Sequence, residues 1–199
     1  MGQYFSNENL QSNIKKIDCF IRGQKFSFYT DNGVFSKSGM DFGSRLLLDV
    51  IPMEEVGGRV LDVGCGYGVF GIIINKLTGS SVDMIDVNLR AIHLSQMNIS
   101  LNHASGINAF ESNVYKNINS KYDFIVTNPP IRAGKNVVYD ILINAKDYLK
   151  DNGRLFFVIR KQQGAVSVID KLKDTYEVNI LDKKKGYFIV ECRNCGVNN

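Results

Sequence analysis

Residues 61–71, LDVGCGYGVFG, join a short apolar strand to a helix through a glycine-rich turn and so decide the fold. Read from Gly66, the letters GYGVFG fit the G-x-G-x-x-G pattern of a dinucleotide-binding turn. Read from Asp62, a carboxylate stands two positions ahead of a Gly-x-Gly-x-Gly turn. In the dinucleotide pattern the first glycine directly follows the strand. Here that residue is Gly64, so the match from Gly66 is out of register.

Asp62 argues against a pyrophosphate in this loop, because a fixed carboxylate repels phosphate charges in a partly buried site. It suits a cation, and S-adenosylmethionine carries an ammonium and a sulfonium group without any phosphate. We expect Asp62 to hold the ammonium group, directly or through water, and its alternative role is to cap the following turn. The turn itself, Gly64, Cys65, Gly66 and Gly68, allows a ligand to approach the backbone closely, and Cys65 is small enough to fit there.

Asp86 ends the strand SVDMID at the place, about 20 residues beyond the glycine turn, where a carboxylate that binds ribose hydroxyls is expected. Since NAD and S-adenosylmethionine share a ribose, Asp86 and the adjacent Val87 are expected to contact either cofactor. The alternative for Asp86 is a surface carboxylate at the start of a helix near Asn88. Asp83 lies three residues earlier and is expected on the opposite face of the strand.

Residues 127–135, TNPPIRAGK, follow a second apolar strand and contain a stiff turn, because each proline fixes its own φ angle. The Asn128 side-chain oxygen and the Pro129 carbonyl offer two acceptors, which suit a planar –NH2 group. Such a nitrogen is a weak nucleophile, and two acceptors can orient it toward a methyl donor. The turn therefore predicts methylation of an exocyclic or amide nitrogen. The expected catalytic residues are Asn128, Pro129, Pro130 and Ile131.

Strands and helices alternate after about residue 55, which predicts a parallel sheet with helices on both faces. Strands are expected at RVLDVG, SVDMIDV, INAFES, YDFIVTNPP, GRLFFVIR, EVNILD and GYFIVEC, and helices at VFGIIINKL, NLRAIHLSQMNISLNH, NVVYDILINAKDYLK and AVSVIDKLKDTY. The third of these helices is expected to close at Asn152 and Gly153. The last two strands lie too close together for a crossover helix and should form a hairpin. We expect a doubly wound α/β fold with a mostly parallel, seven-stranded sheet and an antiparallel C-terminal strand.

Residues 1–55 depart from this pattern. The letters DCFIRGQKFSFYT predict two short strands around Arg22 and Gly23, and DFGSRLLLDVI predicts a helix with an Asp or Ser near its start. We expect one domain over residues 1–199, with an N-terminal elaboration at 1–55 and a cofactor-binding and catalytic core at 56–199.

The composition, 44% hydrophobic and 22% charged residues, is ordinary for a soluble globular protein. No apolar run approaches the ~20 residues that span a bilayer, and the first residues lack the apolar region of a signal peptide. We therefore expect a cytoplasmic protein without a membrane partner, either a monomer or a weak dimer. Cys192 and Cys195 offer only two ligands, so no metal is expected. The net charge of +4 permits a nucleic-acid partner without requiring one.

The motifs LDVGCGYG, MIDVN and TNPPI, in this order and spacing, resemble those of class I S-adenosylmethionine-dependent methyltransferases that act on –NH2 nitrogens. The stretches GVFSKSGMDFGSRLLLDVI, NPPIRAGK and VIRKQQGA resemble the small-domain, RsmC-like ribosomal RNA guanine-N2 methyltransferases. The resemblance implies a Rossmann-like methyltransferase fold, S-adenosyl-L-methionine as cofactor, and guanine N2 of small-subunit (16S) ribosomal RNA, free or in a ribosomal subunit, as substrate. It also implies that Asn113 and Val114 hold the adenine ring. Phe35 and Ser36 should close over the cofactor, unless Phe35 is a core aromatic.

Ile131 departs from relatives that methylate adenine N6 in DNA or protein glutamine, which carry an aromatic residue at this position. The larger RsmC-like enzymes have a second domain ahead of the catalytic one, and this chain is expected to act without it. Two alternatives stay open: another –NH2 nitrogen, in a tRNA base or a protein amide, or a non-catalytic RNA-binding relic of the fold. The presence of Asp62, Asp86 and Asn128 speaks against the relic.

Basic residues flank the predicted catalytic turn. Arg132 and Lys135 follow it directly, while Arg160 and Lys161 end the fifth strand, so all four are expected on one rim of the sheet. There they could contact RNA phosphates, although an ordinary solvated edge is the alternative. The residues 183–185, three lysines in DKKKGY, are expected to be a charged hairpin turn at the other end of the sheet.

Overall fold

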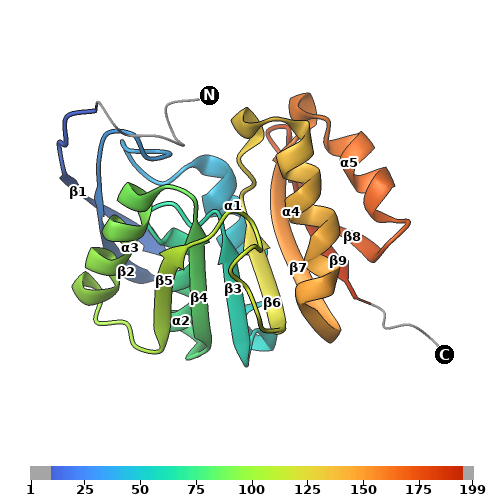
Figure 1. Ribbon diagram of the computed structural model, residues 1–199, viewed down its shortest axis with the longest axis horizontal. Coiled ribbons are helices and arrows are strands. Elements are labelled where there is room, and N and C mark those ends of the chain that lie inside the picture. Colours follow the sequence, from blue (N-terminus) through green and yellow to red (C-terminus); the bar gives the residue numbers. More distant parts are fainter. Residues whose placement is uncertain (1–9, 195–199) are drawn as a thin grey trace.

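The computed structural model describes residues 10–194, in which seven strands form one sheet and two form a separate hairpin (Figure 1). The strands are β1 (Lys15–Ile21), β2 (Gln24–Thr30), β3 (Arg59–Val63), β4 (Ser81–Asp86), β5 (Ile107–Glu111), β6 (Tyr122–Thr127), β7 (Leu149–Arg160), β8 (Glu177–Lys184) and β9 (Tyr187–Arg193). The helices are α1 (Phe42–Val50), α2 (Val69–Thr78), α3 (Leu89–Leu101), α4 (Lys135–Tyr148) and α5 (Ala165–Leu172), with short 3-10 turns at Met53–Glu55, Ile131–Ala133 and Lys161–Gln163.

The large sheet has the strand order β5-β4-β3-β6-β7-β9-β8. Strands β3 to β7 pair in parallel, whereas β9 is antiparallel to both β7 and β8. The predicted doubly wound, mostly parallel sheet is therefore confirmed, and the antiparallel strand lies next to the edge. The strand order reverses at β3, whose neighbours are β4 and β6. Ligands of such sheets bind beyond the carboxyl ends of the strands at this reversal.

Both faces of the central strands β3, β4 and β7 are covered, which explains why these strands are buried at successive positions. Along β3, Val60 packs with α1, α2, α3 and the β1–β2 hairpin, while Leu61 faces α4 and α5. Each fully buried side chain of this size contributes about 1.5–3 kcal/mol to folding. Figure 1 shows α4 and α5 on one side of β6, β7 and β9, with the β1–β2 hairpin beyond α3 at the far edge.

Single residues determine where α1, α2 and α3 begin and where α2 ends. Helix α2 begins after Gly68 and ends before Gly79, both in the left-handed conformation (φ 94° and 74°) that glycine adopts without strain. Asn88 caps α3 by accepting the backbone N–H groups of Arg90 and Ala91. Asp41 caps α1, since its Oδ2 atom accepts the Ser44 N–H at 3.1 Å.

One predicted boundary is wrong. Helix α4 ends at Tyr148 rather than closing at Asn152 and Gly153, and β7 begins at once with Leu149. Leu149 is buried and pairs with Tyr122 of β6, so tertiary packing outweighs the helical pattern at this end. Asn152, with φ of 60°, then lies in an irregular stretch of β7 whose backbone bonds Asn194.

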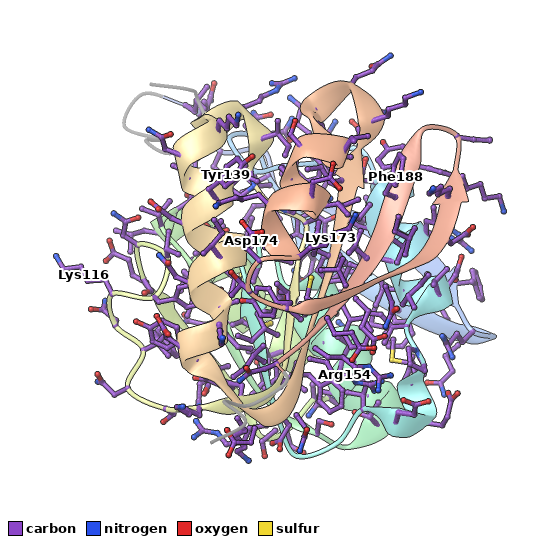
Figure 2. All side chains as sticks on the ribbon, turned by 90° about the vertical axis from the view of Figure 1, so that its right-hand side faces the viewer. Lys116, Tyr139, Arg154, Lys173, Asp174 and Phe188 are labelled. Carbon is purple, nitrogen blue, oxygen red and sulfur yellow. The ribbon has the colours of Figure 1, made fainter. Side chains whose placement is uncertain are left out.

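The position predicted for the three lysines is also wrong. Residues 183–185 end β8 and begin the turn into β9, and Tyr187 of β9 pairs with Arg160, the last residue of β7. Because β8 runs parallel to β7, its end lies at the same edge of the sheet as the predicted catalytic turn at residues 127–135. Figure 2 shows this hairpin turn at the end of the molecule where α4 and α5 begin, with Arg154 of β7 toward the opposite end.

The N-terminal hairpin and helix form as predicted and pack on the sheet. The Arg22 guanidinium at the hairpin turn donates to the carbonyls of Leu48, Asp49 and Ile51, which end α1. No helix within residues 10–194 combines the length and apolarity needed to cross a bilayer.

Candidate active site

A cavity of about 780 Å³ opens at the carboxyl ends of β3, β4, β5 and β6, within the size range of cofactor sites. Most of the sequence-predicted site residues line it: Phe35, Gly64, Cys65, Gly66, Asp86, Val87, Asn113, Val114, Asn128, Pro129, Pro130, Ile131, Arg132 and Arg160. Asp62, Gly68, Lys135 and Lys161 are not part of the lining.

Asp86 ties the loop after β3 to the loop after β4. Its Oδ2 atom accepts the Gly66 N–H at 2.9 Å, and its Oδ1 atom accepts the Asn88 N–H at 2.9 Å. Burial raises the pKa of Asp86, although these N–H donors oppose the shift. Gly64 and Gly66 have φ angles of 71° and 57°, so side chains would strain the loop. The carboxylate thus lies in the cavity wall with lone pairs left for further donors.

Asp62 is fully buried within β3. Its Oδ2 atom accepts the Gly71 N–H at 3.0 Å, so it does cap the first turn of α2, as its alternative role required. Its Oδ1 atom has no partner among the described residues. Burial raises the pKa of Asp62 to about 7, and the nearby Asp86 adds to the effect. The carboxylate therefore already accepts a backbone N–H that a bound phosphate would need. Its other oxygen accepts no hydrogen bond from the described residues.

Among the residues that the structure describes, the Asn128 side chain is held from one side only. Its Nδ2 group donates to Ser44 Oγ at 2.9 Å and to Asp41 Oδ2 at 3.3 Å. A carboxylate only accepts hydrogen bonds, so the amide nitrogen must face Asp41 and the amide oxygen remains available as an acceptor. The Thr127 hydroxyl donates to the Val63 carbonyl at 2.7 Å and joins the ends of β6 and β3. The turn is thereby fixed beside the glycine loop.

Sequence reasoning missed Asp41 and Ser44 as site residues. The letters DFGS marked the start of a helix, and the structure confirms that cap. Nothing local to these letters reveals a partner 84 and 87 residues along the chain. The two side chains therefore belong to the site only through the packing of α1 against the sheet.

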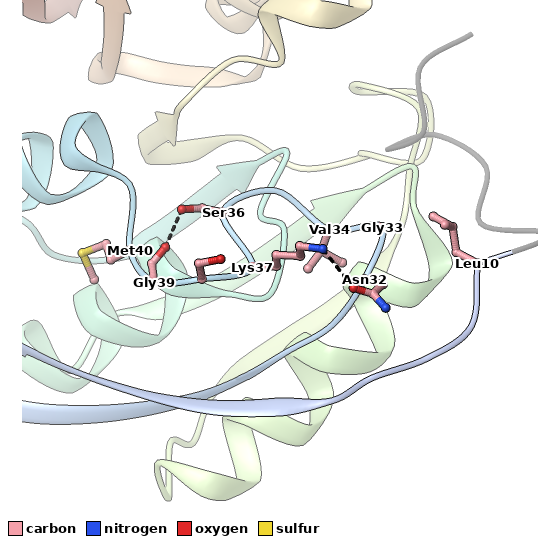
Figure 3. Close-up of a pocket in the computed structure, with 9 residues that line it drawn as sticks. Leu10, Asn32, Gly33, Val34, Ser36, Lys37, Gly39 and Met40 are labelled. Carbon is pink, nitrogen blue, oxygen red and sulfur yellow. Dashed lines mark hydrogen bonds between the residues drawn. The ribbon is translucent and has the colours of Figure 1, made fainter.

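The segment before α1 forms the outer wall of the cavity. Phe35 is 53% exposed and lines the cavity, so the alternative that it is a core aromatic is wrong. A second cavity of about 490 Å³ lies along the same segment and shares Val34, Ser36 and Met40 with the first. Figure 3 shows Ser36 donating to the Gly39 carbonyl and Lys37 reaching Asn32 at 3.1 Å.

The four predicted cations follow the ends of the neighbouring strands β6 and β7, as expected from their positions in the sequence. Arg132 and Arg160 line the cavity, and the Arg160 guanidinium lies 4.5 Å from the centre of the Tyr187 ring. Lys135 begins α4, with its Nζ atom 5.3 Å from the Tyr139 ring centre. All four are therefore at one edge of the sheet.

Within residues 10–194, no three His, Cys, Asp or Glu side chains gather in a way that could hold a metal ion. Cys192 is a buried free thiol in β9, and Cys195 lies outside the described residues.

Comparison with known proteins places these features in a family. The family model "Methyltransferase small domain" matches residues 25–191. The protein YbxB of Bacillus subtilis is 42% identical over 199 residues, covering 97% of this chain and 99% of that protein. Ribosomal RNA small subunit methyltransferase C of Psychromonas ingrahamii is 39% identical over 153 residues, which cover 74% of this chain and 43% of that protein.

Among solved structures, the 16S rRNA N2 methyltransferase RsmC of T. thermophilus, in complex with AdoMet and guanosine, superposes with a TM-score of 0.83 at 25% identity. The match covers 93% of this chain and 52% of that one. The chain thus spans about half the length of these two methyltransferases.

Proposed function

The chain belongs to the family of methyltransferase small domains, and from this premise we propose that it transfers a methyl group from S-adenosylmethionine to guanine N2 of small-subunit ribosomal RNA. The observation that carries the proposal is the Asn128 amide. Its nitrogen is held by Ser44 and Asp41, so its oxygen can accept from a substrate –NH2 group. The matches to RNA methyltransferases at 39% and 25% identity support the choice of substrate.

The site binds and orients the nucleophile rather than deprotonating it. The Asn128 side-chain oxygen and the Pro129 carbonyl would accept the two hydrogens of the –NH2 group and turn its lone pair toward the cofactor pocket. The nitrogen becomes acidic only as the new bond forms, so no strong base is required beforehand. Ile131 and Val137 line the same cavity and would help to keep water from the reacting nitrogen.

The described residues fit S-adenosylmethionine, which supplies a sulfonium-bound methyl group when bound. Asp62 lies behind the cavity lining, so its Oδ1 atom, which has no partner among the described residues, would attract the ammonium group through water. Asp86 offers acceptors for ribose hydroxyls, and Asn113 lies in the cavity wall where it could bond the adenine ring. A dinucleotide fits less well, because Asp62 already accepts the Gly71 N–H at the start of α2.

Binding of S-adenosylhomocysteine near pH 7 is expected to release a proton to the buffer. Asp62, with its pKa raised to about 7, is partly protonated in the free protein, and an adjacent ammonium group would lower that pKa. Calorimetry in buffers of different ionisation enthalpy measures the release. Methylthioadenosine, the same nucleoside without the amino-acid part, and the variant Asp62→Asn should both show none. Equal release with both ligands would contradict an ammonium site at Asp62.

The same group sets an expected pH dependence of stability for the free protein. Its pKa rises from 3.8 to about 7 on folding, so its contribution is present at low pH and is lost as the pH rises through about 7. Thermal unfolding of Asp62→Asn should lack this decline.

The substrate is tested by mapping methylated nucleotides in ribosomal RNA from cells with and without the gene. We expect one N2-methylguanosine of the small-subunit RNA to disappear and to return when the purified protein and S-adenosylmethionine are added. Complete N2-methylation of ribosomal RNA in the deleted strain would overturn the assignment of this substrate. Loss of a methyl group from tRNA or protein instead would identify that molecule as the substrate.

A further inference from the structure

The turn between β8 and β9 carries three exposed lysines beside the candidate active site. Arg160 pairs with Tyr187 across β7 and β9, and Lys184 pairs with the same Tyr187 across β8 and β9. The Lys161 N–H donates to the Gly186 carbonyl at 2.8 Å, which fixes the turn against the end of β7. Tyr187 and Arg160 also line the cavity that contains Asn128. The basic turn and the catalytic turn are therefore parts of one continuous edge.

Five cations of this edge, at the end of β7 and in the β8–β9 hairpin, have no carboxylate partner in the part of the chain that the structure describes. Among the described residues, none of Arg160, Lys161, Lys183, Lys184 and Lys185 forms an ion pair. Other surface lysines are paired, for example Lys25 with Asp18 at 2.7 Å and Lys150 with Asp123 at 2.8 Å. Within residues 10–194, no carboxylate therefore compensates these five positive charges.

Aromatic rings support these cations in place of carboxylates. The Arg160 guanidinium lies 4.5 Å from the Tyr187 ring centre, the Lys185 Nζ atom 5.1 Å from that of Phe42, and the Lys183 Nζ atom 5.1 Å from that of Phe188. Such contacts orient a cation while leaving its N–H groups available to anions. Figure 2 shows Phe188 in this hairpin, near the end of the molecule where the helices begin.

We propose, building on the proposed function, that Lys183, Lys184 and Lys185 together with Arg160 and Lys161 dock the phosphate backbone of the RNA substrate and lead it to Asn128. These five cations lie across the ends of β7, β9 and β8, which cover two strand spacings of about 4.8 Å, or roughly 10 Å. That distance matches roughly three phosphates of a stacked strand at about 3.4 Å each. A row of unpaired cations suits a regularly charged polymer, and phosphate contacts position RNA without reading its sequence.

The test measures the affinity of a labelled single-stranded RNA for the full chain loaded with S-adenosylhomocysteine, over a series of salt concentrations. The triple variant Lys183→Gln, Lys184→Gln, Lys185→Gln is expected to bind about tenfold or more weakly. Its plot of log Kd against log salt concentration should lose about 2 units of slope, since each phosphate contact contributes about 0.7 on single strands. Unchanged affinity for S-adenosylhomocysteine shows that the cavity is intact.

The matched control removes the same charge from the opposite edge of the sheet. Lys76, Lys121 and Lys150 are exposed there, before or at the starts of β4, β6 and β7, and their triple replacement by glutamine should change RNA affinity less than twofold. An equal loss in both triple variants, or no loss in the first, overturns the docking surface. The second outcome would assign the turn to an anionic partner other than RNA.

A single replacement guards against misfolding of the turn. Lys185 and Gly186 have φ angles of 49° and 78°, as in a two-residue hairpin turn whose first position favours asparagine. Lys185→Asn should therefore keep or raise the melting temperature yet weaken RNA binding about twofold to threefold. If wild-type protein binds RNA in this way but transfers no methyl group, the proposed function fails and the docking surface stands. If the triple variant transfers methyl groups to RNA as well as the wild-type protein does, the proposed function stands and the docking surface is overturned.

Discussion

Replacing Asn128 by alanine is expected to lower the rate of methyl transfer by about 10²–10³-fold, the usual effect of losing one preorganised polar group at a reacting centre. The side-chain oxygen is one of the two proposed acceptors for the substrate –NH2 group, and the variant leaves only the other, the Pro129 carbonyl. The dissociation constant of S-adenosylhomocysteine should stay within about tenfold, or 1.4 kcal/mol. Single-turnover assays for the rate and calorimetry for binding separate the two quantities.

The variant Ser44→Ala is expected to lower the rate of methyl transfer by a smaller factor. It removes the 2.9 Å contact to the Asn128 amide nitrogen but keeps the amide oxygen, so the rate should fall by about tenfold or less. If Asn128→Ala lowers cofactor affinity as much as the rate, its main role is to hold the end of β6, and the assignment of a catalytic acceptor is lost.

Replacing Asp86 by alanine is expected to weaken binding of S-adenosylhomocysteine by about 100-fold. The change removes the proposed acceptor of the ribose hydroxyls, and charge-assisted hydrogen bonds contribute about 1.5–3 kcal/mol each. It also releases the Gly66 and Asn88 N–H groups, which fix the cavity wall. Calorimetry on the purified variant measures the loss.

The control for this change is Asp83→Asn, on the same strand. Asp83 accepts from Arg59 and from the Tyr122 hydroxyl, both at 2.8 Å, away from the cavity. This variant should lower the melting temperature without changing the affinity for S-adenosylhomocysteine. An equal loss of affinity in both variants would mean that Asp86 acts only through the stability of β4.

Local patterns predicted most of the sheet because the central parallel strands are mostly buried, and because β3 and β6 end in a glycine turn and a proline turn. The strand ends then placed Gly64, Asp86 and Asn128 around one cavity, since parallel neighbours finish at the same edge. Residues 183–185 were misplaced for a related reason. The end at which a hairpin turn lies depends on the direction of β8, and that direction follows from the crossover through α5 rather than from the lysines themselves.

The C-terminal end of α4 and the partners of Asn128 could not be predicted for a different reason. Leu149 fits the apolar face of a helix as well as a strand, and only its pairing with Tyr122 decides. Ser44 and Asp41 reach Asn128 through a tertiary contact, for which a single sequence holds no local signal. Asp62 shows a third limit, because its charge favoured a cation site but its burial and its Gly71 bond are visible only in the folded chain.

The Asp41 carboxylate, which both caps α1 and holds the Asn128 amide, makes the predicted boundary at residue 55 an unsafe place to cut the chain. A fragment of residues 56–199 would keep the glycine loop, Asp86 and Asn128 itself. It would lack the two groups that turn the amide nitrogen away from the substrate, so the amide could rotate and present its donor side. Such a fragment would keep the motifs LDVGCGYG, MIDVN and TNPPI yet have little catalytic power.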